Sequence, residues 1–146
     1  MAMPNWLASA IYSLLSADTT LAGLVPAAPM MGVVAPSIYF DKAPLEATIP
    51  YIVFTLEPGH TINAMNPTAE IEVSTVELTL VASTSEAVSA IEDRLHVVLR
   101  TAQPTYPMGK HHVSVNRLSF TGPTKAVVDN VWTMTATYRW AYQDQV

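Results

Sequence analysis

The chain has 146 residues, of which 50% are hydrophobic and only 13% are charged, and its formal net charge is −5. The charged fraction is about half that of an ordinary soluble domain, so the composition predicts apolar surface that other protein covers. The acidic balance argues against a nucleic-acid-binding surface, which needs clustered Lys and Arg. The sequence contains no cysteine, which excludes disulfides, thiolate metal sites and cysteine nucleophiles.

The first forty residues carry one charged side chain, Asp18. A membrane span needs about 20 unbroken apolar residues, whereas the apolar run from Trp6 to Leu15 is interrupted by polar residues. A secretory signal is not expected either, because no basic residue precedes Lys42. We therefore expect a homo-oligomer or a larger assembly, in which other protein covers part of this segment. The alternative is a monomer kept soluble by its many Thr, Ser, Asn and Gln residues.

Apolar periodicity predicts a helix from Asn5 to Ala17. Asp18 is expected to cap a second, short helical turn that ends near Pro26. Residues 26–37 have no charge and no periodicity, and they are predicted to be a loop that contacts a partner. Strands are predicted over these segments: Ile38–Phe40, Tyr51–Glu57, Glu70–Ala82, Val113–Phe120 and Trp132–Tyr142.

Residues 58–69 are also uncharged and are predicted to be a long loop or an extended hairpin arm. In the strand that follows, the apolar phase reverses between Val73 and Val76, which predicts a bulge or an exchange of burial between faces. Pro and Gly residues predict a loop over Gln103–Lys110 and a break at Thr121–Pro123.

The second long helix follows residue 82 and has the clearest pattern in the chain. Ser83 and Glu86 match a capping box. The predicted buried stripe is Val88, Ile91, Leu95, Val98 and Leu99, and the predicted solvent side is Glu86, Glu92, Asp93, Arg94 and Arg100. The order helix, strands, helix, strands predicts an α+β fold in one domain over residues 1–146. It would be a mainly antiparallel sheet of about four to five strands with two helices packed on one face.

For each residue that could bind a metal ion or act in catalysis, a structural role is a better explanation than a functional one. His111 and His112 are adjacent, so on a strand they would point to opposite faces. His96 lies four residues after Glu92, and a helical ion pair is favoured over a cation site. The acids Glu57, Glu70, Glu72 and Glu77 could be a general acid–base pair, but charges on a solvated strand edge are favoured.

The last strand has an aromatic face and a polar face. Its Trp and Tyr side chains could stack nucleic-acid bases, but they lack interleaved basic residues, so core packing under the helices is favoured. The opposite face, from Thr133 to Arg139, would line a subunit seam, line a lumen or face solvent. The sequence also has no nucleophile elbow, no phosphate-binding loop and no dinucleotide motif. No catalytic, cofactor or metal site is therefore predicted, and we expect the chain not to be an enzyme.

Three segments in order resemble the tail-terminator, or tail-completion, family of long-tailed bacteriophages and gene transfer agents. They are LLSADTTLAGLV at residues 14–25, IYFDKAP at residues 38–44 and IPYIVF at residues 49–54. The family pattern continues with a long strand, a capped helix and a final strand pair, so the resemblance covers most of the chain. This sequence departs from the family at residues 26–37, where the family passes quickly from helix to strand.

The resemblance implies a structural virion protein with a small α+β fold. Six copies would form a ring, a hexamer, at the head-proximal end of the tail tube, stop tube polymerisation and join the tail to the head. The implied partners are other copies of the chain, the tail tube protein and the head–tail connector or stopper. Genomic DNA would pass through the lumen without specific binding, which the acidic balance suits. No cofactor or membrane is implied, and the protein would reside in the tail or neck after assembly in the host cytoplasm.

Partner contacts are predicted in the two uncharged segments, at Met30, Met31, Val33, Val34, Ile62 and Met65. Two alternatives keep the virion setting: a head–tail adaptor or stopper, and a minor tail protein. An alternative from another class is a small ligand-binding or enzyme domain that uses the aromatic strand face as a pocket.

Overall fold

A computed structural model describes residues 5–25, 28–30, 33–35, 37–43, 47–63, 69–101, 104, 106, 109–125 and 131–145. In these ranges the chain forms the helices α1 (Asn5–Ala17), α2 (Thr19–Leu24) and α3 (Ser85–Arg100). Its strands are β1 (Ala28–Met30), β2 (Val33–Ala35), β3 (Ile38–Phe40), β4 (Tyr51–Asn63), β5 (Ala69–Ala82), β6 (Lys110–Lys125) and β7 (Trp132–Gln145). None of the described helices has the length and apolar character needed to cross a membrane.

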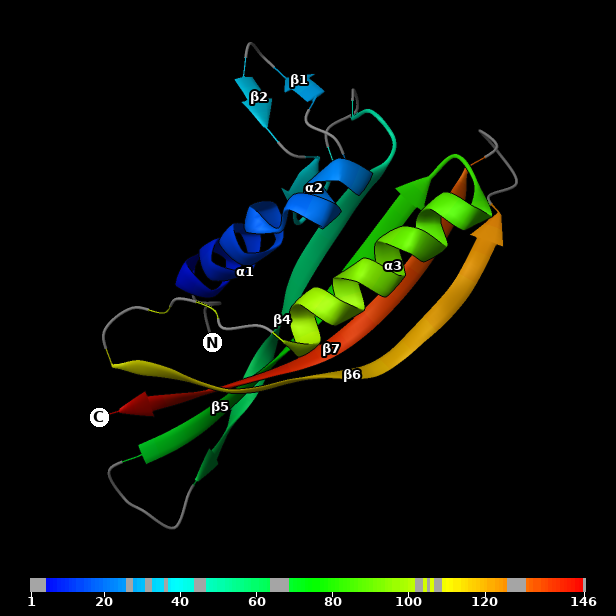
Figure 1. Ribbon diagram of the computed structural model, residues 1–146. Helices are drawn as coiled ribbons and strands as arrows, with labels where there is room; N and C mark the ends of the chain where they lie inside the picture. Colours follow the sequence, from blue (N-terminus) through cyan, green and yellow to red (C-terminus); the bar gives the residue numbers. More distant parts are fainter. Residues whose placement is uncertain are drawn as a thin grey trace.

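Five strands form one sheet in the order β3-β4-β5-β7-β6. The β3–β4 pair is parallel, and the other three pairs are antiparallel. Figure 1 shows α1, α2 and α3 together on one face of this sheet. The predicted α+β class, the number of strands and the one-sided placement of the helices are confirmed.

The first two helices form as their sequence predicts. Leu7, Ile11 and Leu15 have no exposed surface, because their spacing places them on the sheet side of α1. Asp18 adopts an extended conformation, and its carboxylate accepts a hydrogen bond from the backbone N–H of Leu21 at 2.8 Å. The predicted cap of α2 is therefore confirmed.

Both uncharged segments contain more strand than predicted. Residues 26–37 include the antiparallel pair β1–β2, so the prediction of a structureless loop was wrong; the β-branched pair Val33 and Val34 favours a strand there. In residues 58–69, β4 continues to Asn63, which makes this segment a hairpin arm. The β4–β5 register shifts between Glu57 and His60, so the extra residue lies in β4 and not in β5, where a bulge was predicted; β5 pairs with β7 without interruption.

Helix α3 begins one residue later than predicted. Thr84, with its extended backbone, is the N-cap, and its hydroxyl accepts a hydrogen bond from the N–H of Ala87 at 3.1 Å. The predicted capping box of Ser83 and Glu86 was therefore wrong. The predicted buried stripe is confirmed in full, but Glu92 was wrongly assigned to the solvent side and is only 5% exposed.

Strand β6 is twice the predicted length, with register shifts at three places along it. Among the described strands it pairs only with β7, so it lies at an edge of the sheet. An edge strand tolerates Pro123, because a missing N–H on the outer side breaks no ladder hydrogen bond. The sequence predicted a break at Thr121–Pro123. The strand continues there instead, with a register shift between Thr121 and Thr124.

The core lies between the helices and one face of β4, β5 and β7. On this face of β7, Met134, Ala136, Tyr138, Trp140 and Tyr142 are buried and Trp132 is partly buried, which confirms that the aromatic face is core. Strand β5 is central, so the prediction that Glu72 lies on a solvated edge was wrong. Instead, Glu72 lies opposite Tyr142 and accepts a hydrogen bond from its hydroxyl.

One ion pair fastens α2 to α3. The guanidinium of Arg94 donates to both carboxylate oxygens of Asp18, at 2.6 Å and 2.8 Å. These hydrogen bonds, with a smaller contribution from the N–H of Leu21, hold the pKa of Asp18 below its ordinary value of 3.8, although partial burial acts the other way. Asp18 therefore caps one helix and binds the next.

We predict that Asp18→Asn removes an acid-sensitive part of the stability. Asn is as good an N-cap as Asp, so this variant keeps the cap and loses the charge. Because the pKa of Asp18 is lower in the folded state, its contribution is present above pH 3.8 and is lost as the pH falls through the lowered value. Urea unfolding at several pH values should show the two proteins converging in acid. An equal difference at all pH values would contradict the ion-pair assignment.

Candidate interaction surfaces

The predicted contact residues lie in two separate projections. Met30 pairs with Val33 and Val34 pairs with Pro29 in the β1–β2 hairpin, whereas Ile62 pairs with Ile71 in the β4–β5 arm. Met31 and Met65 lie outside the described residues. In Figure 1 the hairpin and the end of the arm lie at opposite ends of the molecule, so they cannot form one continuous surface.

The outer edge of β6 displays apolar side chains. Val113 is 45% exposed, Leu118 is 57% exposed and Phe120 is 50% exposed. Val113 and Leu118 fall at register shifts and have no partner residue in β7. A bulge re-aims the side chain at that position, so these irregularities direct apolar groups toward solvent.

Arg117 connects β6 to α3 on the helix side of the sheet. Its Nη1 donates to Oε1 of Glu92 at 2.6 Å, and the side chain of Glu92 is only 6% exposed. The Arg117 guanidinium also lies 4.3 Å from the centre of the Phe120 ring, a cation–π distance. Arg117 therefore explains how a carboxylate can be buried in α3, and it orients an exposed aromatic ring.

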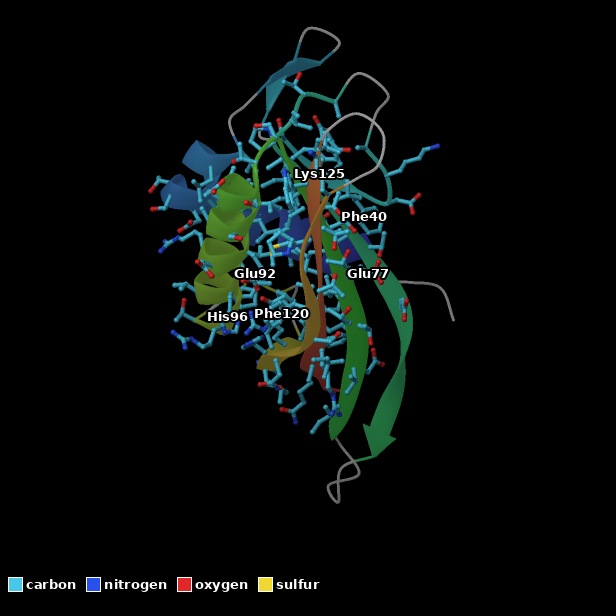
Figure 2. The ribbon with its side chains drawn as sticks, turned by 90° about the vertical axis from the view of Figure 1, so that its right-hand side faces the viewer. Phe40, Glu77, Glu92, His96, Phe120 and Lys125 are labelled. Atoms are coloured by element: carbon cyan, nitrogen blue, oxygen red, sulfur yellow. The ribbon has the colours of Figure 1, made fainter. Side chains whose placement is uncertain are left out.

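His96 does not pair with Glu92, so the predicted helical ion pair was wrong. Its Nδ1 lies 3.3 Å from the hydroxyl of Tyr138 instead, since Glu92 is bound to Arg117. Burial raises the pKa of Tyr138 to about 12, and the nearby Glu92 carboxylate adds to this, so the phenol stays neutral. Figure 2 shows Glu92 and His96 on α3 and Glu77 on the sheet. Within the described residues, no three His, Asp or Glu side chains could hold a metal ion.

A hollow lies at the other edge of the sheet, between α1 and strands β3 and β4. Its volume is about 400 Å³, and it is lined by Ala8, Ser9, Tyr12, Ser13, Phe40 and Phe54. Phe40 is 43% exposed, and its ring centre lies 5.2 Å from that of Phe54. The described residues that line the hollow include no carboxylate, Lys, Arg or His, so the hollow suits an apolar side chain.

Tyr106 organises a third cluster, at the end of α1. The indole N–H of Trp140 donates to the Tyr106 hydroxyl at 2.6 Å. The Tyr106 hydroxyl also lies 3.0 Å from Nδ1 of His112, and donation of its proton to that nitrogen would place the His112 proton on Nε2. Trp6 packs edge-on against Tyr106 and Tyr142, with ring centres 5.4 Å and 4.8 Å apart.

The burial of this cluster explains its two pKa shifts. Burial raises the pKa of Tyr106 to about 12, which keeps it neutral. Burial also lowers the pKa of His112 below 6.5. Tyr106 lies in a predicted Pro/Gly loop, where no periodic pattern marks it; an aromatic residue within such a loop was the available signal.

The remaining surface is the sheet face that carries no helix. It presents rows of Thr from β5 and β7, among them Thr75, Thr79, Thr135 and Thr137, all half-buried. Glu77 from β5 and Arg139 from β7 flank this hydroxyl-rich face. The sequence left open whether this face contacts another subunit, lines a lumen or faces solvent. Its polar character is compatible with all three.

No family model matches the sequence, and no curated protein matches it. The fold does match solved structures. A chain in a structure described as the virion of a native gene transfer agent particle superposes with a TM-score of 0.69 at 18% identity. The match covers 95% of this chain and 96% of that chain. This protein shares the fold of a gene transfer agent virion chain.

A second solved structure, of a protein known only by a sequence identifier, gives a TM-score of 0.56 at 15% identity. That match covers 99% of this chain and 98% of the other. Identities this low establish the fold alone. The match to the gene transfer agent chain therefore supports the resemblance to phage-like particle proteins in fold, and the tail-terminator role stays a prediction.

We predict that Arg117→Ala destabilises the protein by about 3 kcal/mol, because it leaves Glu92 buried without its partner. The double variant Glu92→Leu with Arg117→Leu should recover most of that loss, since it also removes the buried charge. Urea unfolding of the two variants and the wild type measures both effects. An Arg117→Ala protein as stable as the wild type would contradict the assigned role of the pair.

We predict that Tyr106→Phe costs about 1–3 kcal/mol, because it leaves the Trp140 indole N–H without an acceptor. In the wild type, NMR titration should show His112 as the Nε2–H tautomer with a pKa below 6.5. Because that pKa is lowered by folding, the His112 contribution to stability is complete above pH 6.5 and declines as the pH falls below it. A raised pKa or the other tautomer would contradict the hydrogen-bond assignment.

Proposed function

We propose that the chain is a structural virion protein of a phage-like particle, a tail terminator that assembles as a ring at the head-proximal end of the tail tube. The observation that carries this proposal is the fold match to a gene transfer agent virion chain. The match spans almost all of both chains, so the whole structure corresponds and not one widespread motif. The ordered tail-terminator motifs in residues 14–54 support the more specific role.

The surfaces described above suit a protein that works by association. A ring built from identical copies needs two different contact surfaces on each copy. The two edges of the sheet differ in this way, because β6 projects apolar side chains and the α1–β3 edge is hollow. A net charge of −5 suits a ring through which DNA slides, because few basic groups would grip its phosphates.

A head–tail adaptor, a stopper ring or a minor tail protein is the second candidate. The same fold match supports it, since the match concerns a particle chain and the fold alone. A tail-tube gene directly downstream of this gene would favour the terminator. The ligand-binding or enzyme alternative gains little support, because the aromatic face of β7 is buried core and not a pocket, and among the described residues the hollow is lined by no carboxylate, Lys, Arg or His.

Recruitment to tail tubes tests the proposal directly. We predict that the purified chain, mixed with polymerised tail tube protein, adds one ring at one end of each tube and stops further elongation. Negative-stain electron microscopy with a labelled chain would show both results. Binding along the length of the tube, or tubes that elongate unchanged, would contradict the terminator role.

The same assay tests the predicted contact segments. Met31→Glu and Ile62→Asp place charge in the two uncharged projections, so either change should reduce ring formation or tube binding while leaving the helix content intact. Ala90→Glu, on the exposed side of α3, is the matched control and should behave as the wild type. If both segment variants also behave as the wild type, these projections are not the contact sites.

A further inference from the structure

The two outer edges of the sheet carry unlike apolar features that fit each other. We propose that Leu118 and Phe120 of one copy insert into the hollow between α1 and β3 of a second copy. The chain would then associate with itself head to tail. This inference rests on the proposed function, because it names the surfaces by which a ring-forming protein would meet its neighbours.

The projecting side chains, Leu118 and Phe120, are exposed, and Phe120 is held in place by Arg117. Both side chains have at least half of their surface in solvent. Arg117 lies against the Phe120 ring and is itself anchored by Glu92 of α3. A side chain that is already ordered loses less conformational entropy on binding, so this arrangement favours association.

The backbone of β6 is poorly suited to a different mode of association, the addition of a strand from another molecule. Its three register shifts bend the edge and interrupt the regular row of N–H and C=O groups that strand addition needs. The side chains of Leu118 and Phe120, in contrast, are exposed on this strand. Contact through Leu118 and Phe120 is therefore favoured over continuation of the sheet.

The receiving side has matching chemistry. The hollow has a volume of about 400 Å³ and is lined by apolar groups and hydroxyls from α1, β3 and β4. Helix α1 has no charged residue along its 13 positions, which is unusual for a helix at a protein surface. Phe40, at the hollow, is 43% exposed and would be covered by the inserted side chains.

Charge also favours contact between unlike edges. Strand β6 contains no acidic residue; its Arg117 is paired with Glu92, and Lys110 and Lys125 are its other cations. On the receiving side, Asp41 follows Phe40 directly and Glu57 lies further along β4, both exposed, with Lys42 as the one described cation on that edge. Two β6 edges would bring cations together, whereas β6 against the β3 edge places cations near carboxylates.

The geometry determines what such a contact builds. Strands β6 and β3 are the first and last strands of a five-stranded sheet, so the two surfaces lie on opposite sides of the molecule. A contact between different surfaces repeats from copy to copy, and it closes into a ring when the rotation between neighbours divides a full turn. Leu118 and Phe120 would act as the central anchors of a larger interface.

Two charge variants, one on each side, test the pairing. Leu118→Glu damages the projection, and Ser13→Glu fills the hollow with a charged group; both residues are exposed, so the fold should survive. Each change should weaken self-association at least about tenfold, the loss expected for an anchor side chain. Ala90→Glu is the control for added charge and should self-associate as the wild type. Light scattering with circular dichroism measures assembly and folding together.

An equimolar mixture of the two variants gives the sharpest result. Ser13→Glu keeps an intact projection and Leu118→Glu keeps an intact hollow, so the mixture should form heterodimers and nothing larger. Because the sequence has no cysteine, disulfide trapping needs no background substitutions. Leu118→Cys mixed with Ser13→Cys should cross-link on oxidation, whereas Leu118→Cys alone and the exposed control Thr20→Cys should not.

Several outcomes would overturn the inference. These are a wild type that stays monomeric, variants that assemble normally, a mixture with no heterodimer, and Leu118→Cys that cross-links to itself. The result is separable from the proposed function. Variants that assemble normally and still cap tubes would refute this contact and leave the terminator role intact. A wild type that associates through this contact but never binds tubes would refute the terminator role alone.

Discussion

The position of α3 is the constraint on which the rest of the structure depends. Glu92 and Arg94 are two residues apart, so they point to nearly opposite sides of the helix. Glu92 binds Arg117 on the edge strand β6, and Arg94 binds Asp18 at the start of α2. One helix thus holds both the N-terminal helices and the far edge of the sheet, while its apolar stripe covers the core between them.

This arrangement fixes what the molecule exposes. Because all described helices lie on one face (Figures 1 and 2), the other face is left as a polar surface rich in Thr, and no described strand pairs with the outer edge of β3 or of β6. Arg117 acts both in the core and at the edge of the sheet. It neutralises the buried carboxylate of Glu92, and it orients Phe120 at the edge. The interaction that completes the core is therefore also the one that orients an exposed aromatic ring at the edge of the sheet.

Sequence patterns predicted the helices and strands in which apolar residues repeat regularly along one buried face. Helices α1 and α3 and the strand β7 bury one regular face each, so spacing alone identified them. The environment of Glu92 could not be predicted, because its partner lies 25 residues away on another element. The length of β6 depends on pairing with β7, and the hollow at Phe40 depends on the parallel placement of β3 beside β4. Those features arise from tertiary contacts that no local pattern encodes.

On the proposal above, apolar side chains at both edges of the sheet are covered only when copies associate. Hydroxyl-radical footprinting of dilute and concentrated protein measures this most directly, because it reports the exposure of individual side chains. The account predicts that Leu118 and Phe120 at one edge, and Phe40 at the other, lose reactivity together on association, while exposed Val97 on α3 does not change. Unchanged reactivity at both edges, or protection confined to one of them, would contradict it.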